Sequence, residues 1–115
     1  MQVLTKEVAA VEQAHNRLGL SYREIAGALH ADESTVHRWR SGTTEPSRVF
    51  LDRLEALQEF MDELGRTFRS KDGARGWLDR PVPDLGGRTP REMLLGGRLE
   101  RVTRLLLRLN LGMTV

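Results

Sequence analysis

The side chains best suited to binding chemistry lie close together, in the segment 34–40. They supply two hydroxyl groups, one imidazole and two guanidinium groups, from Ser34, Thr35, His37, Arg38 and Arg40. Between them, Val36 and Trp39 recur at helical spacing, and we expect them to face a core. Such polar groups reach phosphate oxygens and the edges of bases, so the pattern predicts a helix that reads the major groove of DNA.

The surrounding residues predict a helix-turn-helix over residues 20–42. Ser21 and Glu24 have the spacing of a capping box at the start of a first helix, and Asp32 is placed to cap the second. His30 occupies the turn position where this motif often has glycine, and Gly42 ends the second helix. The alternative interpretation is an ordinary helical hairpin without a role in DNA binding.

No set of residues predicts catalysis or a bound metal. The chain has no cysteine, and His15, His30 and His37 have no spacing that pairs them with carboxylates as metal ligands. His15 is expected to be a half-buried helix residue. We therefore expect a protein that is not an enzyme and needs no cofactor. The lack of cysteine, of a secretory signal and of a long apolar stretch predicts a cytoplasmic protein with no membrane segment.

Charge is distributed unevenly along the 115 residues. Residues 1–45 carry five Lys and Arg against six Asp and Glu, whereas residues 46–115 carry thirteen against ten. A DNA reader without excess positive charge gains little affinity from the release of counterions. We therefore expect a homodimer, or a larger assembly, that places two readers on a repeated site.

The apolar periodicity predicts an all-α fold. Besides the two helices of the reader, the expected helices cover residues 5–18, 47–68, 74–79, a short stretch from residue 89, and 98–110. The long helix 47–68 carries a wide apolar stripe for packing within the chain or against a second copy, namely Phe50, Leu54, Leu57, Met61 and Leu64. We expect a helix-turn-helix bundle at residues 1–45, joined by the long helix to a second small helical domain at residues 46–115.

The second domain contains a combination of short motifs. Trp77-Leu78 is followed by Leu85-Gly86-Gly87-Arg88-Thr89-Pro90, by a leucine-rich helix and by Gly112 near the end of the chain. Over residues 47–115 this combination resembles the toxin-binding domain of the Xre/MbcA/ParS antitoxin family. The helix-turn-helix also lies where that family has its Xre-type DNA reader.

The resemblance implies an antitoxin of a type II toxin–antitoxin pair. In that family the C-terminal domain blocks a toxin, usually a RES-domain enzyme that consumes NAD, and the N-terminal domain represses the antitoxin's own operon. Residues 46–115 would then bind the toxin and dimerise, with the chain end and the adjacent loops at the entrance of the toxin's active site. The candidate toxin-binding residues are Trp77, Arg88, Arg101, Arg104, Arg108, Leu111, Met113 and Val115.

Several alternatives stay open at this stage. Trp77 is either a core residue or an anchor at a partner interface, and the stripe of Arg101, Arg104 and Arg108 is either a solvated face or a basic edge. For the whole protein, one alternative is a stand-alone helix-turn-helix regulator whose C-terminal half only dimerises. Another is a partner-binding module whose helix-turn-helix no longer binds DNA.

Overall fold

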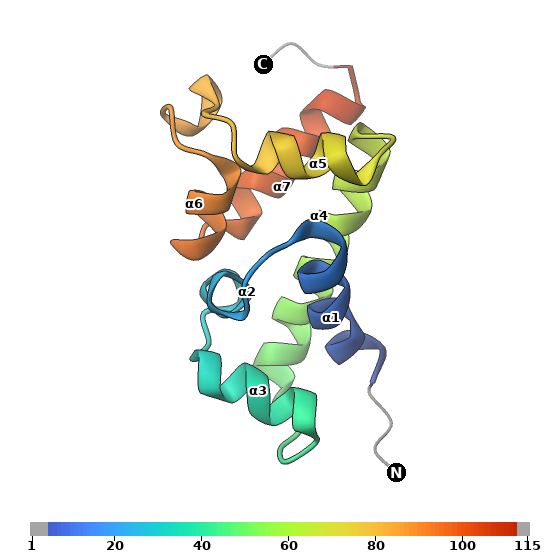
Figure 1. The fold of residues 1–115 in the computed structure, drawn as a ribbon, viewed down its shortest axis with the longest axis vertical. Helices are drawn as coiled ribbons and strands as arrows, with labels where there is room; N and C mark the ends of the chain where they lie inside the picture. The colour runs from blue at the N-terminus through green and yellow to red at the C-terminus, as the bar shows by residue number, and fades with distance from the viewer. Residues whose placement is uncertain (1–4, 113–115) are drawn as a thin grey trace.

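The computed structural model describes residues 5–112, and every regular element in this range is a helix (Figure 1). In chain order these are α1 (Lys6–Leu18), α2 (Tyr22–Leu29), α3 (Glu33–Ser41), α4 (Arg48–Thr67), α5 (Lys71–Leu78), the 3-10 helix η1 (Pro83–Leu85), α6 (Pro90–Leu95) and α7 (Leu99–Asn110). The predicted all-α fold is therefore confirmed. None of these described helices is long and apolar enough to cross a lipid bilayer.

Side-chain caps begin four of the helices. In each case a hydroxyl oxygen accepts a hydrogen bond from the backbone N–H three residues later, and the capping residues are Thr5, Ser21, Ser70 and Thr89. At α2 the capping box is complete, because Glu24 Oε1 also accepts from the Ser21 N–H at 2.8 Å. Asp32 occupies the expected N-cap position of α3, but its side chain makes no capping hydrogen bond. Because Ser70 caps α5, that helix begins earlier than the predicted residue 74.

The long helix α4 forms the axis of the molecule, with α1 and α2 against it and α7 running alongside (Figure 1). Three residues of the predicted apolar stripe, Leu54, Leu57 and Leu64, are buried within this chain. The remaining two, Phe50 and Met61, are partly buried against the same core. The stripe is thus used mainly inside the chain, and dimerisation through it stays a prediction.

The hydrophobic core is continuous across the predicted domain boundary between residues 45 and 46. Helix α2 of the reader lies against α6, and α1 lies against both α4 and α5. The second half of the chain therefore supports the reader directly, through a shared core.

Candidate DNA-reading and partner-binding surfaces

Helices α2 and α3 form the predicted helix-turn-helix, with His30 at its turn. This residue has a left-handed backbone conformation (φ 56°, ψ 39°). Among residues 5–112, no other non-glycine residue has a positive φ. That conformation costs a residue with a side chain roughly 1–2 kcal/mol. The side chain offsets this cost, because His30 Nε2 donates a hydrogen bond to the carbonyl oxygen of Gly97 at 2.9 Å. The turn is thereby tied to the segment between α6 and α7.

The outer face of α3 carries four of the five predicted DNA-reading residues. Ser34, His37 and Arg38 are exposed, and Thr35 is half-buried. Arg38 Nη2 donates to Thr35 Oγ1 at 3.0 Å, which directs the guanidinium along the helix surface. Val36 and Trp39 are buried on the opposite face. The arrangement presents hydroxyl, imidazole and guanidinium groups on one accessible surface.

Arg40, the fifth candidate, is used inside the protein. Its guanidinium pairs with Glu12 of α1, and its Cζ lies 3.9 Å from the centroid of the Tyr22 ring. The Tyr22 ring is in turn stacked on His15 with a centroid distance of 4.1 Å. The hydrogen bond to Glu12 raises the pKa of Arg40 against the opposing effect of burial, so the guanidinium stays charged. Arg40 holds α3 on α1 and α2, a role that sequence reasoning missed because Glu12 is 28 residues away.

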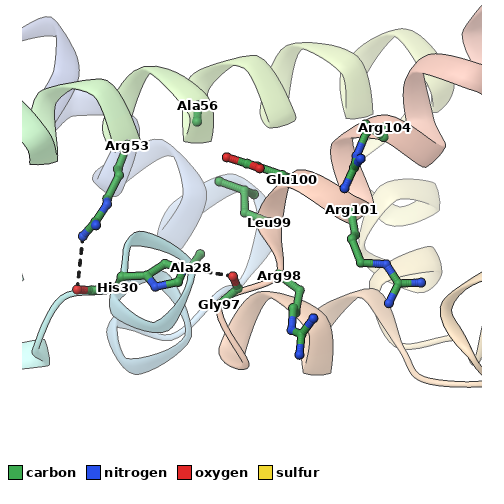
Figure 2. A pocket seen from close by; sticks show the side chains of 10 residues that line it. All are labelled: Ala28, His30, Arg53, Ala56, Gly97, Arg98, Leu99, Glu100, Arg101 and Arg104. Carbon is green, nitrogen blue, oxygen red and sulfur yellow. Dashed lines mark hydrogen bonds between the residues drawn. The ribbon is translucent and has the colours of Figure 1, made fainter.

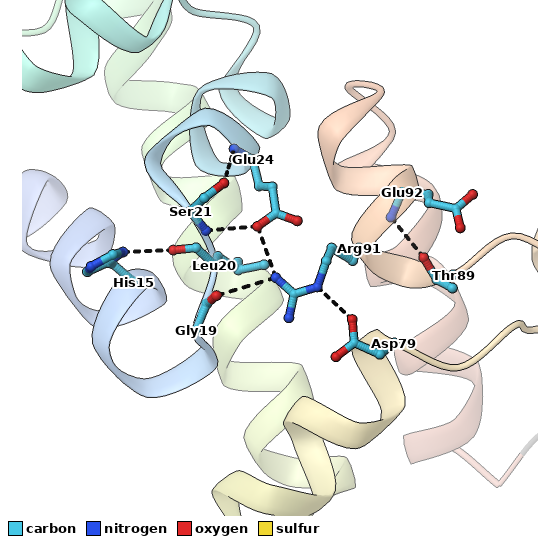
Figure 3. A network of polar contacts seen from close by, with 9 residues as sticks. All are labelled: His15, Gly19, Leu20, Ser21, Glu24, Asp79, Thr89, Arg91 and Glu92. Carbon is cyan, nitrogen blue, oxygen red and sulfur yellow. Dashed lines mark hydrogen bonds and ion pairs between the residues drawn. The ribbon is translucent and has the colours of Figure 1, made fainter.

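Arg91 of α6 connects the reader to the second half of the chain (Figure 3). Its Nε donates to Asp79 Oδ1 at 2.7 Å, and its Nη1 donates to Glu24 Oε1 at 2.9 Å and to the carbonyl oxygen of Gly19 at 3.4 Å. Burial alone would lower the pKa of Arg91, but the hydrogen bond to Asp79 and the charge of Glu24 outweigh it and raise that pKa. The guanidinium therefore remains charged while it bridges three segments.

The backbones of α2 and α6 approach closely beside this bridge. A Cβ atom at Gly27 would lie 2.4 Å from the carbonyl oxygen of Leu95 and 3.0 Å from its Cα. Only glycine fits such an approach without a shift of the backbone. Together with Arg91 and with the bond between His30 and Gly97, this contact makes α6 a rigid support for the reader. In the sequence, the one local sign of this close contact between α2 and α6 was a glycine inside a predicted helix.

The predicted partner-binding residues lie mostly on the surface of the second half. Arg101, Arg104 and Arg108 are exposed along one side of α7, and Arg88 is exposed in the loop after η1. Leu111, just after α7, is 74% exposed.

Three further candidates are placed differently. Trp77 is only 9% exposed and packs against Phe68 with ring centroids 5.5 Å apart, so it belongs to the hydrophobic core. Met113 and Val115 lie outside the described residues.

Polar contacts tie the last turn of α7 to α4. Asn110 Nδ2 donates to Glu63 Oε2 at 2.7 Å and to the Glu63 carbonyl oxygen at 3.2 Å. Thr67 Oγ1 donates to Asn110 Oδ1 at 3.0 Å. The buried Glu63 carboxylate also pairs with Arg66. These contacts position the end of α7, and sequence reasoning did not identify them because the partners are 43 and 47 residues apart.

Among residues 5–112, no group of three or more His, Cys, Asp and Glu side chains is arranged to hold a metal ion. The exposed residues predicted for DNA and partner binding lie on the outer face of α3, on one side of α7, in the loop after η1 and just after α7.

Two family models match the chain, one in each half. A homeodomain-like domain matches residues 4–49, which contain the helix-turn-helix. The antitoxin Xre/MbcA/ParS C-terminal toxin-binding domain matches residues 63–112, so its match begins within α4. The two matches define the class as a helix-turn-helix protein with an antitoxin-type C-terminal domain.

Relatives match nearly the whole chain. The mycobacterial cidal antitoxin MbcA of Mycobacterium tuberculosis and that of Mycobacterium bovis are each 32% identical over 98 residues, which cover 85% of this chain and 86% of the relative. A chain in the crystal structure of the M. tuberculosis MbcT-MbcA toxin-antitoxin complex superimposes with a TM-score of 0.67 and 30% identity, covering 96% of this chain and 99% of that chain. The chain belongs to the Xre/MbcA/ParS antitoxin family, as its motifs predicted.

Proposed function

We propose that this protein neutralises a partner toxin through its C-terminal half and represses its own operon through its helix-turn-helix. The observation that carries the proposal is the surface of the second half, where exposed arginines and an exposed leucine lie in the region matched by the toxin-binding family model. The relatives are named antitoxins, and the similar structure is titled a toxin-antitoxin complex.

The toxin-binding surface consists of the exposed face of α7, the loop after η1 and the end of the chain. Arg88, Arg101, Arg104 and Arg108 supply charge at this surface, while Leu111, Met113 and Val115 provide apolar contacts at the chain end. Trp77 is buried in the core and is not part of this surface. A short apolar chain end that enters the toxin's active site would block it without any catalytic group or cofactor in the antitoxin.

The family resemblance also suggests the chemistry of the toxin. We infer a RES-domain enzyme that consumes NAD, so that neutralisation preserves the NAD pool of the cell.

The DNA half acts on the operator of the same operon. Ser34, Thr35, His37 and Arg38 contact the DNA from the exposed face of α3, and Arg40 acts by holding that helix in place. Because the reader carries no excess of positive charge, we infer that two copies bind a repeated site as a homodimer.

Co-expression with the product of the adjacent open reading frame tests the proposal. We expect that product to arrest growth and deplete NAD when expressed alone, and this protein to restore both and to co-purify with it. A gel shift on the operon's own promoter, repeated at several salt concentrations, tests the second activity. Absence of rescue and of co-purification would reject neutralisation, and absence of a shift would reject autorepression.

A further inference from the structure

Three arginines from separate positions in the fold line one hollow between η1, α6 and α7. Arg88 comes from the loop after η1, Arg98 precedes α7, and Arg101 lies in its first turn. The hollow has a volume of about 330 Å³, and Leu85, Gly86 and Met93 complete its lining. No Asp or Glu is among these lining residues, so the hollow presents three positive charges and no negative one.

These arginines are not used to hold the described part of the protein together. Within residues 5–112, no carboxylate oxygen lies within 4.0 Å of their guanidinium nitrogens, whereas Arg40, Arg66 and Arg91 are all paired in this way. Figure 2 shows Arg98 and Arg101 extending away from α4, while Glu100 between them extends toward α4. Glu100 lines the neighbouring hollow of Figure 2, which Arg98 and Arg101 also border, and it does not line the hollow between η1, α6 and α7.

The position of two of the charges also gives no benefit to the helix. Cations stabilise the C-terminal end of a helix, whereas Arg98 and Arg101 lie at the N-terminal end of α7. Like charges that share one hollow repel each other, and a bound anion relieves that repulsion. Guanidinium groups bind carboxylates with two parallel hydrogen bonds, so a hollow of this kind suits carboxylate groups.

The surface next to the hollow indicates which kind of molecule carries those carboxylates. A second hollow shares Arg101 and Leu85 with the first and continues along α7 to Arg104 and Arg108. Its lining holds three arginines and one carboxylate, that of Asp84, so it also carries an excess of positive charge. Beyond it lie Leu109, which is 42% exposed, and Leu111. Interfaces with nucleic acid are polar and strongly basic, whereas protein interfaces combine arginine with exposed apolar side chains. The combination of exposed arginines along α7 with exposed leucines near its end therefore favours a protein partner.

We propose that the hollow formed by Arg88, Arg98 and Arg101, here called the arginine hollow, binds carboxylate side chains of an acidic segment on the toxin. The inference rests on the proposed function and adds the chemistry by which the toxin is recognised. It also assigns a binding role to Arg98, which the sequence did not single out. The arginine hollow takes the acidic segment, and the leucines at the end of α7 take adjacent apolar residues.

The test compares two double variants of the full-length chain in their binding to the toxin. Arg98→Gln with Arg101→Gln removes two charges from the arginine hollow. Arg17→Gln with Arg69→Gln removes two exposed charges from a different hollow, between α1, α4 and α5, and serves as the matched control. Circular dichroism and thermal unfolding of both variants establish that the fold is kept.

Surface plasmon resonance with the product of the adjacent open reading frame gives the result. We expect the variant of the arginine hollow to bind about 30-fold more weakly, mainly through faster dissociation, and the control to change less than about twofold. If the variant of the arginine hollow binds the toxin as tightly as the control variant and the wild-type chain do, the arginine hollow is not the recognition site. The proposed function then still stands.

If the wild-type chain binds no toxin, the proposed function fails, and the arginine hollow is then tested separately. A hexaglutamate peptide is titrated into the isotope-labelled full chain while the Nε–Hε signals of the arginines are followed by nuclear magnetic resonance. Shifts confined to Arg88, Arg98 and Arg101 support a carboxylate site, and no shift overturns it. A duplex of random DNA that moves these signals more strongly than the peptide would also overturn the assignment.

Discussion

Replacing Gly27 with alanine tests whether α6 supports the reader as closely as the structure indicates. The new Cβ would lie 2.4 Å from the carbonyl oxygen of Leu95, and ordinary contact begins near 3.4 Å, so α6 must move by about 1 Å. Overpacking of this kind costs about 1–3 kcal/mol, while alanine regains up to about 1 kcal/mol of helix propensity. The movement also stretches the bond from His30 to Gly97, which contributes about 1 kcal/mol. The expected net loss is about 2 kcal/mol of unfolding free energy.

Gly65 provides the matched control, because it also lies inside a helix but a Cβ there meets nothing within 4 Å. Gly65→Ala should therefore stabilise the protein by about 0.5–1 kcal/mol. Urea unfolding followed by circular dichroism at 222 nm measures both variants, and equal m-values would show that the change lies in stability. If Gly27→Ala is as stable as the wild type, or approaches Gly65→Ala, the close contact between α2 and α6 does not exist and the reasoning is refuted.

Three further predictions address the reader, the bridge and the chain end. Arg38→Ala should weaken operator binding by about 1–3 kcal/mol in a gel shift at fixed salt, and unaltered affinity would contradict its role as a base contact. The free energy of unfolding should hardly change, because the side chain is exposed. Arg91→Ala should lower the unfolding free energy measured in urea by roughly 1–3 kcal/mol, because Glu24 and Asp79 lose a shared partner. Arg91→Lys should recover only part of this loss, and full recovery by lysine would show that the forked geometry of the guanidinium is unimportant. Deletion of residues 111–115 should abolish protection from the toxin while the gel shift and the helical circular dichroism spectrum persist; a folded truncated protein that still rescues growth would reject the blocking model.

Local sequence patterns were sufficient for most of the secondary structure and for the family. Caps such as Ser21 and Thr89 satisfy backbone groups only three residues away, so their effect can be recognised in a short segment. Helical periodicity likewise indicated the buried faces of α4 and α7, because a side chain's direction follows from its position in the turn. The family match depended on motifs that keep their order along the chain, which the sequence displays directly.

Tertiary structure decided which of the candidate side chains remain available at the surface. Periodicity placed Arg40 on an outer face, but Glu12 and Tyr22 from other helices engage it. Periodicity left open whether Trp77 is a core residue or an anchor at an interface, and its packing against Phe68 places it in the core. The bonds from His30 to Gly97 and from Arg91 to Glu24 each join residues 67 positions apart, and they bring the reader and the antitoxin half together over one core. Such pairings depend on how whole helices pack, and a local pattern carries no information about the distant partner.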